Sequence, residues 1–73
     1  MTIFDLYVKC DNIMPGACFY LYDKSLNYIH KDRPLYAGGY EELADNEDDP
    51  TELEVSTFEV KDDGYAVHVR LVV

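Results

Sequence analysis

The sequence predicts an α+β fold, in which an N-terminal helix packs on one face of an antiparallel sheet of about four strands that ends in a β-hairpin. The most informative segment is residues 65–73, where large apolar side chains alternate with a face that carries His68 and Arg70, as in a half-buried strand. The preceding residues 61–64 (KDDG) are typical of a tight turn, because Gly64 can adopt the left-handed conformation. Apolar residues at helical spacing near the N-terminus add the helix.

Residues 2–10 favour this helix. Thr2 and Asp5 stand at the cap and the third helical position, a capping-box pair in which Asp replaces Glu. The apolar residues that follow at helical spacing are Ile3, Leu6, Tyr7 and Cys10. A strand stays open as the alternative, because a second set alternates along the same residues: Phe4, Leu6, Val8 and Cys10.

The next part of the chain predicts a loop, a hairpin and an irregular crossing. Residues 12–16 (NIMPG) contain Pro and Gly and are expected to form the loop. Residues 17–23 alternate as a strand, residues 23–27 are polar enough for a hairpin loop, and residues 28–31 return as a short second strand. Residues 33–39 begin with Arg-Pro and end with Gly-Gly, which indicates an irregular crossing. One face of the first strand carries Ala17, Phe19 and Leu21.

Residues 40–60 predict a short helix, a polar connection and a third strand. Residues 40–45 (YEELAD) are expected to form one or two helical turns, with acids near the N-terminus as the helix dipole favours. Residues 46–51 are polar and contain Pro. Along residues 52–60 the apolar side chains change phase, so a β-bulge near Ser56-Thr57 is expected to restore their alternation.

Length and composition indicate one domain, residues 1–73. A chain this short buries only about 60% of its unfolded surface, so its stability is expected to be modest. Its hydrophobic content of 48% is enough for a packed core. There is no apolar run of about 18 residues, and the N-terminus lacks the features of a signal peptide, so a cytoplasmic location is expected. Cys10 and Cys18 are then expected to stay reduced.

The net charge of −9 is concentrated in one part of the chain. Residues 34–60 contain nine acids and no Lys or Arg, whereas the six acids and six bases outside them cancel. We call residues 41–54 the acidic segment; its acids are Glu41, Glu42, Asp45, Glu47, Asp48, Asp49, Glu52 and Glu54. Such a field repels nucleic acid and anionic membrane, and it attracts basic surfaces.

The sequence shows no motif for catalysis, metal binding or nucleotide binding, so we expect neither an enzyme nor a cofactor. The two cysteines are eight residues apart and the two histidines are isolated, which is not a metal-ligand spacing. Residues 45–56 superficially resemble a calcium loop, but Pro50 replaces the Gly that its sharp turn needs and Ser56 replaces its bidentate Glu. Gly38-Gly39 lacks the lysine of a P-loop. The paired carboxylates lie in a run expected to be flexible, whereas acid–base catalysis needs fixed placement.

Protein binding is the class that remains. The acidic segment predicts a partner with a basic surface, with its eight acids as contact residues and with no direct binding to nucleic acid or membrane. Clustered carboxylates can approximate a short piece of nucleic acid, because duplex DNA carries about one charge per 1.7 Å. The alternative is a non-enzymatic structural or regulatory module that self-associates, or binds a protein, through an exposed sheet edge or a Tyr-rich sheet surface, since the chain has seven tyrosines. A plainer reading of the acids is that they keep a small protein in solution.

Four short motifs follow one another along the chain: TIFDL (residues 2–6), YLYD (residues 20–23), YEELAD (residues 40–45) and the hairpin of residues 53–73. Their order resembles a group of small proteins encoded by phages and mobile elements of Firmicutes, from which residues 32–39 (DRPLYAGG) depart. The group has no established function, so no functional residue carries over. The resemblance implies a setting in a bacterial host cell, where accessory phage genes encode small acidic inhibitors of host defence, including anti-restriction and anti-CRISPR proteins that mimic DNA. The leading hypothesis is therefore a nucleic-acid mimic that inhibits a host DNA- or RNA-handling protein.

Overall fold

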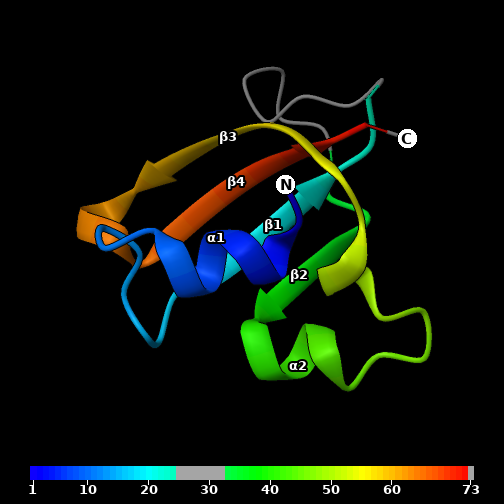
Figure 1. Ribbon diagram of the computed structural model, residues 1–73, viewed down its shortest axis with the longest axis horizontal. Coiled ribbons are helices and arrows are strands. Elements are labelled where there is room, and N and C mark those ends of the chain that lie inside the picture. Colours follow the sequence, from blue (N-terminus) through cyan, green and yellow to red (C-terminus); the bar gives the residue numbers. More distant parts are fainter. Residues whose placement is uncertain (25–32, 73) are drawn as a thin grey trace.

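The computed structural model describes residues 1–24 and 33–72. Within these ranges the chain forms a helical layer on one sheet (Figure 1). The elements in chain order are α1 (Ile3–Lys9), β1 (Cys18–Tyr22), β2 (Tyr36–Gly39), α2 (Tyr40–Ala44), the 3₁₀ turn η2 (Pro50–Glu52), β3 (Val55–Lys61), the 3₁₀ turn η3 (Asp62–Gly64) and β4 (Ala66–Leu71). The four strands lie in the order β2-β1-β4-β3. The predicted α+β class, with an N-terminal helix on a sheet of about four strands, is confirmed.

α1 confirms the helix predicted near the N-terminus, and its first turn carries the predicted capping box. The Thr2 hydroxyl accepts a hydrogen bond from the Asp5 N–H at 3.2 Å, and the Asp5 carboxylate accepts one from the Thr2 N–H at 3.0 Å. The bond from the Thr2 backbone lowers the pKa of Asp5 below its ordinary value. The helix turns Ile3 and Leu6 into the core, where both side chains are fully buried.

β1 and β4 form the centre of the sheet and run parallel. Phe19 and Leu21 of β1 lie beside Val67 and Val69 of β4, and all four side chains are fully buried. The pairs β1–β2 and β3–β4 are antiparallel, whereas β1–β4 is parallel, so the sheet is mixed. The prediction of an entirely antiparallel sheet was therefore wrong. Short turns specify antiparallel neighbours, whereas a parallel pair is joined through a long stretch of chain and leaves no local signal.

β3 and β4 form the predicted C-terminal hairpin. Their register shifts between Val55 and Thr57, which confirms the bulge expected at this point. The turn is tight because residues 62–64 all have positive φ angles. Tyr65 caps this turn instead of opening β4, so its side chain is exposed and does not share the buried face of the strand as expected.

β2 replaces the irregular crossing that the sequence indicated for residues 33–39. It pairs antiparallel with β1, from Tyr36 opposite Leu21 to Gly39 opposite Cys18. Two consecutive glycines give little intrinsic strand propensity, so this strand depends on the pairing that β1 offers. The short strand expected at residues 28–31 and most of the hairpin loop before it lie outside the described residues.

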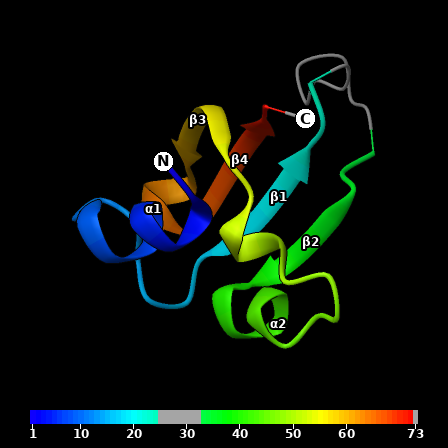
Figure 2. The same ribbon diagram turned by 45° about the vertical axis from the view of Figure 1, so that its right-hand side comes forward.

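The connection between β2 and β3 crosses the whole width of the sheet, because these two strands lie at opposite edges. It contains the predicted short helix, α2, and then η2. Together with α1 these elements lie on one side of the sheet (Figure 2). The buried cluster between the two layers consists of Ile3, Leu6, Ile13, Ala17, Phe19, Leu21, Leu43, Val55, Val67, Val69 and Leu71.

Gly64→Val is expected to lower the free energy of unfolding by about 1–3 kcal/mol. Gly64 has a φ angle of 98°, and a Cβ at this position would collide with the Asn12 carbonyl oxygen. Urea denaturation measures the change. Gly16→Ala is the control, because a Cβ at Gly16 would meet no atom within 4 Å. Equal losses of stability in the two variants would contradict this steric explanation.

Leu71→Ala is expected to cost about 2–4 kcal/mol of stability, because it removes buried apolar volume. The predicted burial of this strand face is confirmed, with exposed fractions of 0% for Val67, 0% for Val69 and 1% for Leu71. Thermal and chemical denaturation followed by circular dichroism measure the effect. Val72→Ala, at a side chain 48% exposed, is the control and should change stability by less than about 0.5 kcal/mol. A Leu71→Ala loss as small as that would show that this strand is not central to the core.

Candidate acidic interaction surface

The acidic segment, residues 41–54, makes up most of the connection that crosses the sheet between β2 and β3. Three residues anchor it to the protein: Leu43 of α2 is 3% exposed, and Pro50 and Thr51 of η2 are also buried. A charged chain can lie over an apolar sheet only if apolar anchors face inward, since burying an unpaired carboxylate is costly. The segment is therefore packed against the core, which corrects the expectation of a flexible run.

Four of the eight predicted contact residues also have a hydrogen-bond partner inside the protein. Three of these bonds tie the segment to other parts of the chain, and the bond between Thr51 and Asp49 lies within it. The acceptors are Glu42, from the Gly39 N–H at 3.3 Å; Asp48, from the Tyr36 hydroxyl at 3.1 Å; Asp49, from the Thr51 hydroxyl at 2.6 Å; and Glu54, from the N-terminal ammonium of Met1 at 2.6 Å. The Asp48 hydrogen bond raises the pKa of Tyr36 above its ordinary value.

The other four contact residues point into solvent. They are exposed and form no side-chain hydrogen bond or ion pair with any described residue: Glu41, Asp45, Glu47 and Glu52. Their negative charge is available to a partner without breaking a contact in the protein. The structure therefore divides the predicted contact residues into a set that holds the segment in place and a set that only displays charge.

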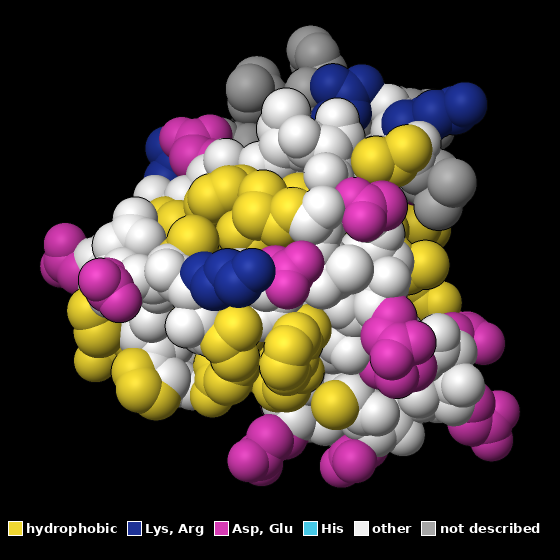
Figure 3. Space-filling model, viewed as in Figure 1, with side chains coloured by type: hydrophobic (Ala, Val, Ile, Leu, Met, Phe, Trp, Pro, Cys, Tyr) yellow, Lys and Arg dark blue, Asp and Glu magenta, His cyan; other side chains and the backbone are white. Residues whose placement is uncertain are grey.

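Basic side chains do not neutralise this surface. Figure 3 shows the carboxylates gathered at the lower right, over α2 and the chain that follows it, with no Lys or Arg among them. Two of the described lysines are held by acids outside the segment: Lys9 lies 3.8 Å from Asp5, and Lys61 lies 2.8 Å from Glu59. The charge imbalance seen along the sequence is therefore preserved in space.

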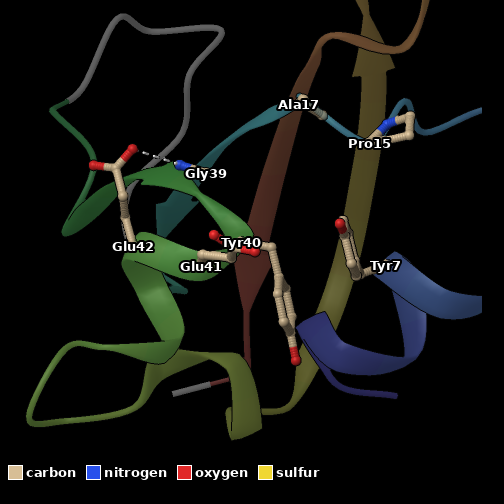
Figure 4. Close-up of a pocket in the computed structure, with 8 residues that line it drawn as sticks. Tyr7, Pro15, Ala17, Gly39, Tyr40, Glu41 and Glu42 are labelled. Carbon is tan, nitrogen blue, oxygen red and sulfur yellow. Dashed lines mark hydrogen bonds between the residues drawn. The ribbon is translucent and has the colours of Figure 1, made fainter.

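A groove of about 300 Å³ borders the acidic segment. It lies between α1, the start of β1 and the N-terminus of α2 (Figure 4). The rings of Tyr7 and Tyr40 stack in its lining, with centroids 4.3 Å apart and planes 6° from parallel. Figure 4 shows the Tyr7 hydroxyl pointing toward the side of the groove formed by Pro15, whereas the Tyr40 hydroxyl points the opposite way. Glu41 lies beside Tyr40 and adds a carboxylate to the lining.

This groove could not be anticipated from the sequence. Tyr7 was placed among the apolar residues at helical spacing in the N-terminal helix, and Tyr40 was the first residue of the short helix expected at residues 40–45. The two meet only because α2 lies on the same side of the sheet as α1. A tyrosine near one end of each predicted helix was the only signal available, and it does not specify contact.

A second aromatic cluster lies on the opposite face of the sheet. The rings of Tyr20 and His68 stack with centroids 4.8 Å apart, and the Tyr22 hydroxyl lies 3.1 Å from Nδ1 of His68. Burial lowers the pKa of His68, and a hydrogen bond with Cys18 raises the pKa of Tyr20. Four of the described tyrosines thus lie on two separate surfaces, and the sheet lies between this cluster and the groove.

Other kinds of site find no support in residues 1–24 and 33–72. No group of three or more His, Cys, Asp or Glu side chains in these ranges is arranged to hold a metal ion. Cys10 and Cys18 are free thiols. Of the helices in these ranges, none is long and apolar enough to cross a membrane.

Comparison with protein-family models, with curated proteins and with solved structures found no match to this chain. The resemblance to small phage proteins therefore stays a prediction. The residues themselves define a class: a small α+β protein whose sheet-crossing connection displays an uncompensated acidic surface beside an aromatic groove.

Asp48→Asn is expected to lower the pKa of Tyr36 toward the ordinary value of tyrosine, because it removes the carboxylate that stabilises the protonated phenol. An NMR titration of the Tyr36 ring carbon that bears the hydroxyl measures this pKa. Glu47→Gln is the control, because it removes a neighbouring charge but not the hydrogen bond. A Tyr36 titration unchanged by Asp48→Asn would mean that the contact is not formed in solution.

The same contact gives a direction for stability against pH. The folded-state pKa of Tyr36 is raised, so the contribution is complete below the unfolded-state pKa of tyrosine and is lost as the pH rises through the folded-state value.

Proposed function

We propose that this protein is a small acidic interaction protein of phage type, which binds the nucleic-acid-binding surface of a host protein and inhibits it by imitating nucleic acid. The observation that carries the proposal is the acidic segment: eight acids on one anchored connection, with no Lys or Arg between them. In this function the protein acts by occupying a surface. It therefore needs no catalytic residue and no cofactor.

The length of the crossing supports imitation of a nucleic-acid backbone. The connection joins strands that lie three strand spacings apart in the sheet, and at about 4.8 Å each this is about 14 Å. Duplex DNA carries about one charge per 1.7 Å, hence about eight phosphate charges over the same length. The segment has eight carboxylates, of which Glu54 is paired with the N-terminal ammonium, so the seven others give a similar charge density.

The internal hydrogen bonds support the proposal in a second way. Asp48 and Asp49 are held by Tyr36 and Thr51, and Leu43 anchors α2 in the core. A segment that is already ordered loses less conformational entropy when it binds than a disordered acidic tail would. Fixed carboxylates can also match the spacing of basic groups in a groove, which gives selectivity as well as attraction.

The test is a charge reversal that spares the fold. The triple variant Asp45→Lys, Glu47→Lys, Glu52→Lys changes side chains that are exposed and have no partner among the described residues, so its stability should stay close to wild type. Wild-type protein is used to capture host proteins from a lysate at about 50 mM and about 200 mM salt. We expect capture that weakens with salt, is displaced by duplex DNA, and is lost in the triple variant.

A matched pair of single variants separates local from overall charge. Glu47→Lys and Asp11→Lys change the net charge equally, and both side chains are exposed. Glu47→Lys should weaken capture several-fold more than Asp11→Lys if the acidic segment is the contact surface. Equal effects, or capture that duplex DNA cannot displace, would count against imitation of nucleic acid.

Self-association is a second candidate, and the outer edge of β3 favours it. This strand is seven residues long, and no described strand pairs with its outer edge. Met1 covers only its beginning, where the Val55 N–H donates to the Met1 carbonyl at 2.6 Å. An unpaired edge can add a strand from another chain. Analytical ultracentrifugation over a range of concentrations tests this candidate: pairing through β3 predicts a dimer whose formation does not weaken with the charge reversal of the acidic segment.

A further inference from the structure

The groove beside the acidic segment has a lining that selects for one kind of side chain. We infer that it receives an arginine side chain from the basic surface that the acidic segment binds; the inference rests on the proposed function. Glu41 and Glu42 belong to both the groove and the acidic segment, so a partner that covers the segment also reaches the groove.

The polar groups of the lining favour a cation. Glu41 is exposed and has no partner among the described residues, and Glu42 uses one carboxylate oxygen to accept from the Gly39 N–H. The Tyr7 hydroxyl points toward the groove from the α1 side (Figure 4). None of the described residues that line the groove is Lys, Arg or His. A cation therefore finds acceptors on several sides and no repelling charge.

The apolar groups of the lining favour arginine over lysine. Tyr7 and Tyr40 of the lining stack on one another, and Phe4, which lies outside the lining, has its ring centroid 6.4 Å from that of Tyr40. A planar guanidinium packs against aromatic surface, is more weakly hydrated than an ammonium, and donates to a carboxylate and a hydroxyl at the same time. Its aliphatic stem suits the exposed apolar side of α1, where Phe4 is 51% and Val8 is 55% exposed.

The size of the groove agrees with a single side chain. Its volume of about 300 Å³ is at the lower end for small-molecule pockets, so it suits one arginine rather than a larger ligand. Figure 3 shows hydrophobic side chains between α1 and α2, next to the carboxylates of the acidic surface. The groove is thus a specific position within a broader surface of negative charge.

The test uses two labelled peptides of equal length and charge, one of four Gly-Arg repeats and one of four Gly-Lys repeats. Binding to the wild-type protein is measured by fluorescence anisotropy at about 50 mM and about 200 mM salt. We expect the arginine peptide to bind about fivefold more tightly than the lysine peptide. NMR titration should show the largest arginine-specific shifts at the backbone amides of Gly16 and Gly39, which line the groove.

Two variants alter the groove without removing a charge: one blocks it and the other removes an aromatic ring from its lining. Gly16→Leu adds a side chain at the groove, and because a Cβ there meets no atom within 4 Å the fold should tolerate it. Tyr40→Leu removes half of the aromatic stack. Both should bring the ratio of the two affinities to about one, while binding of the lysine peptide stays near wild type. Glu47→Gln, outside the groove, should weaken both peptides equally and leave the ratio unchanged.

The outcomes distinguish the groove from the acidic surface as a whole. If both peptides bind with the expected salt dependence but Gly16→Leu leaves their ratio unchanged, the groove does not hold the arginine and the proposed function stands. If neither peptide binds, or if the triple charge reversal binds both as well as wild type, the proposed function fails. A further outcome is that the triple variant still prefers the arginine peptide. If adding Gly16→Leu to it abolishes that preference, the result supports the groove but not the proposed function. Dimerisation of the wild type that Gly16→Leu abolishes would assign the groove to a second copy and overturn the assignment to a partner.

Discussion

The parallel pairing of β1 with β4 is the constraint on which the other features depend. The two strands are far apart in sequence, and the chain between them has to fill both edges of the sheet, with β2 beside β1 and β3 beside β4. The chain that leaves β2 must therefore reach the opposite end of the strand order, and here it passes over the same face of the sheet as α1. In this protein the crossing is the acidic segment, so the strand order determines where the charge is displayed.

This arrangement resolves a conflict between charge and burial. Phe19, Leu21 and Val69 offer a fully buried apolar surface that must be covered, while the connection that covers it contains eight acids. The conflict is resolved by alternation within the segment: Leu43 and Pro50 face inward, and the acids between them face solvent or accept hydrogen bonds. Mutual repulsion among the acids still opposes the compact state. A protein selected for stability alone would have little reason to concentrate its charge on one connection.

Features encoded by neighbouring residues could be predicted from the sequence. The capping box of Thr2 and Asp5, the bulge at Thr57 and the turn at Gly64 each depend on the chemistry of a few adjacent side chains. Charge along the chain likewise identified the acidic segment. The prediction that this segment is flexible was wrong. Its polar composition indicated flexibility, and the buried anchors Leu43, Pro50 and Thr51 could not be recognised from the sequence.

Features that depend on distant parts of the chain could not be predicted. β2 contains Gly38-Gly39 and has little strand propensity of its own, so only its place beside β1 makes it a strand. The parallel strands β1 and β4 are not joined by a short turn, so no local sequence signal indicates that they pair. The groove is still harder to predict from the sequence, because the stacking of Tyr7 on Tyr40 requires both the crossing of the sheet by the β2–β3 connection and the placement of α1. The sequence therefore indicated the acidic candidate residues, which their charge identifies, but not Tyr7 and Tyr40, whose role depends on a contact between distant parts of the chain.

Only one of the two aromatic surfaces, the groove with Tyr7 and Tyr40, lies next to the acidic segment. From the sequence, an acidic surface and a Tyr-rich surface were competing explanations of protein binding. In the structure Tyr20 and His68 lie across the sheet from the acidic segment, whereas Tyr7 and Tyr40 adjoin it. Under the proposed function, charge and aromatic packing act together at one site: long-range attraction would bring a basic partner close, and the groove would select for the shape of its side chain. Attraction that depends on charge alone weakens with salt, whereas selection by packing does not, so one surface can combine rapid association with discrimination among basic partners.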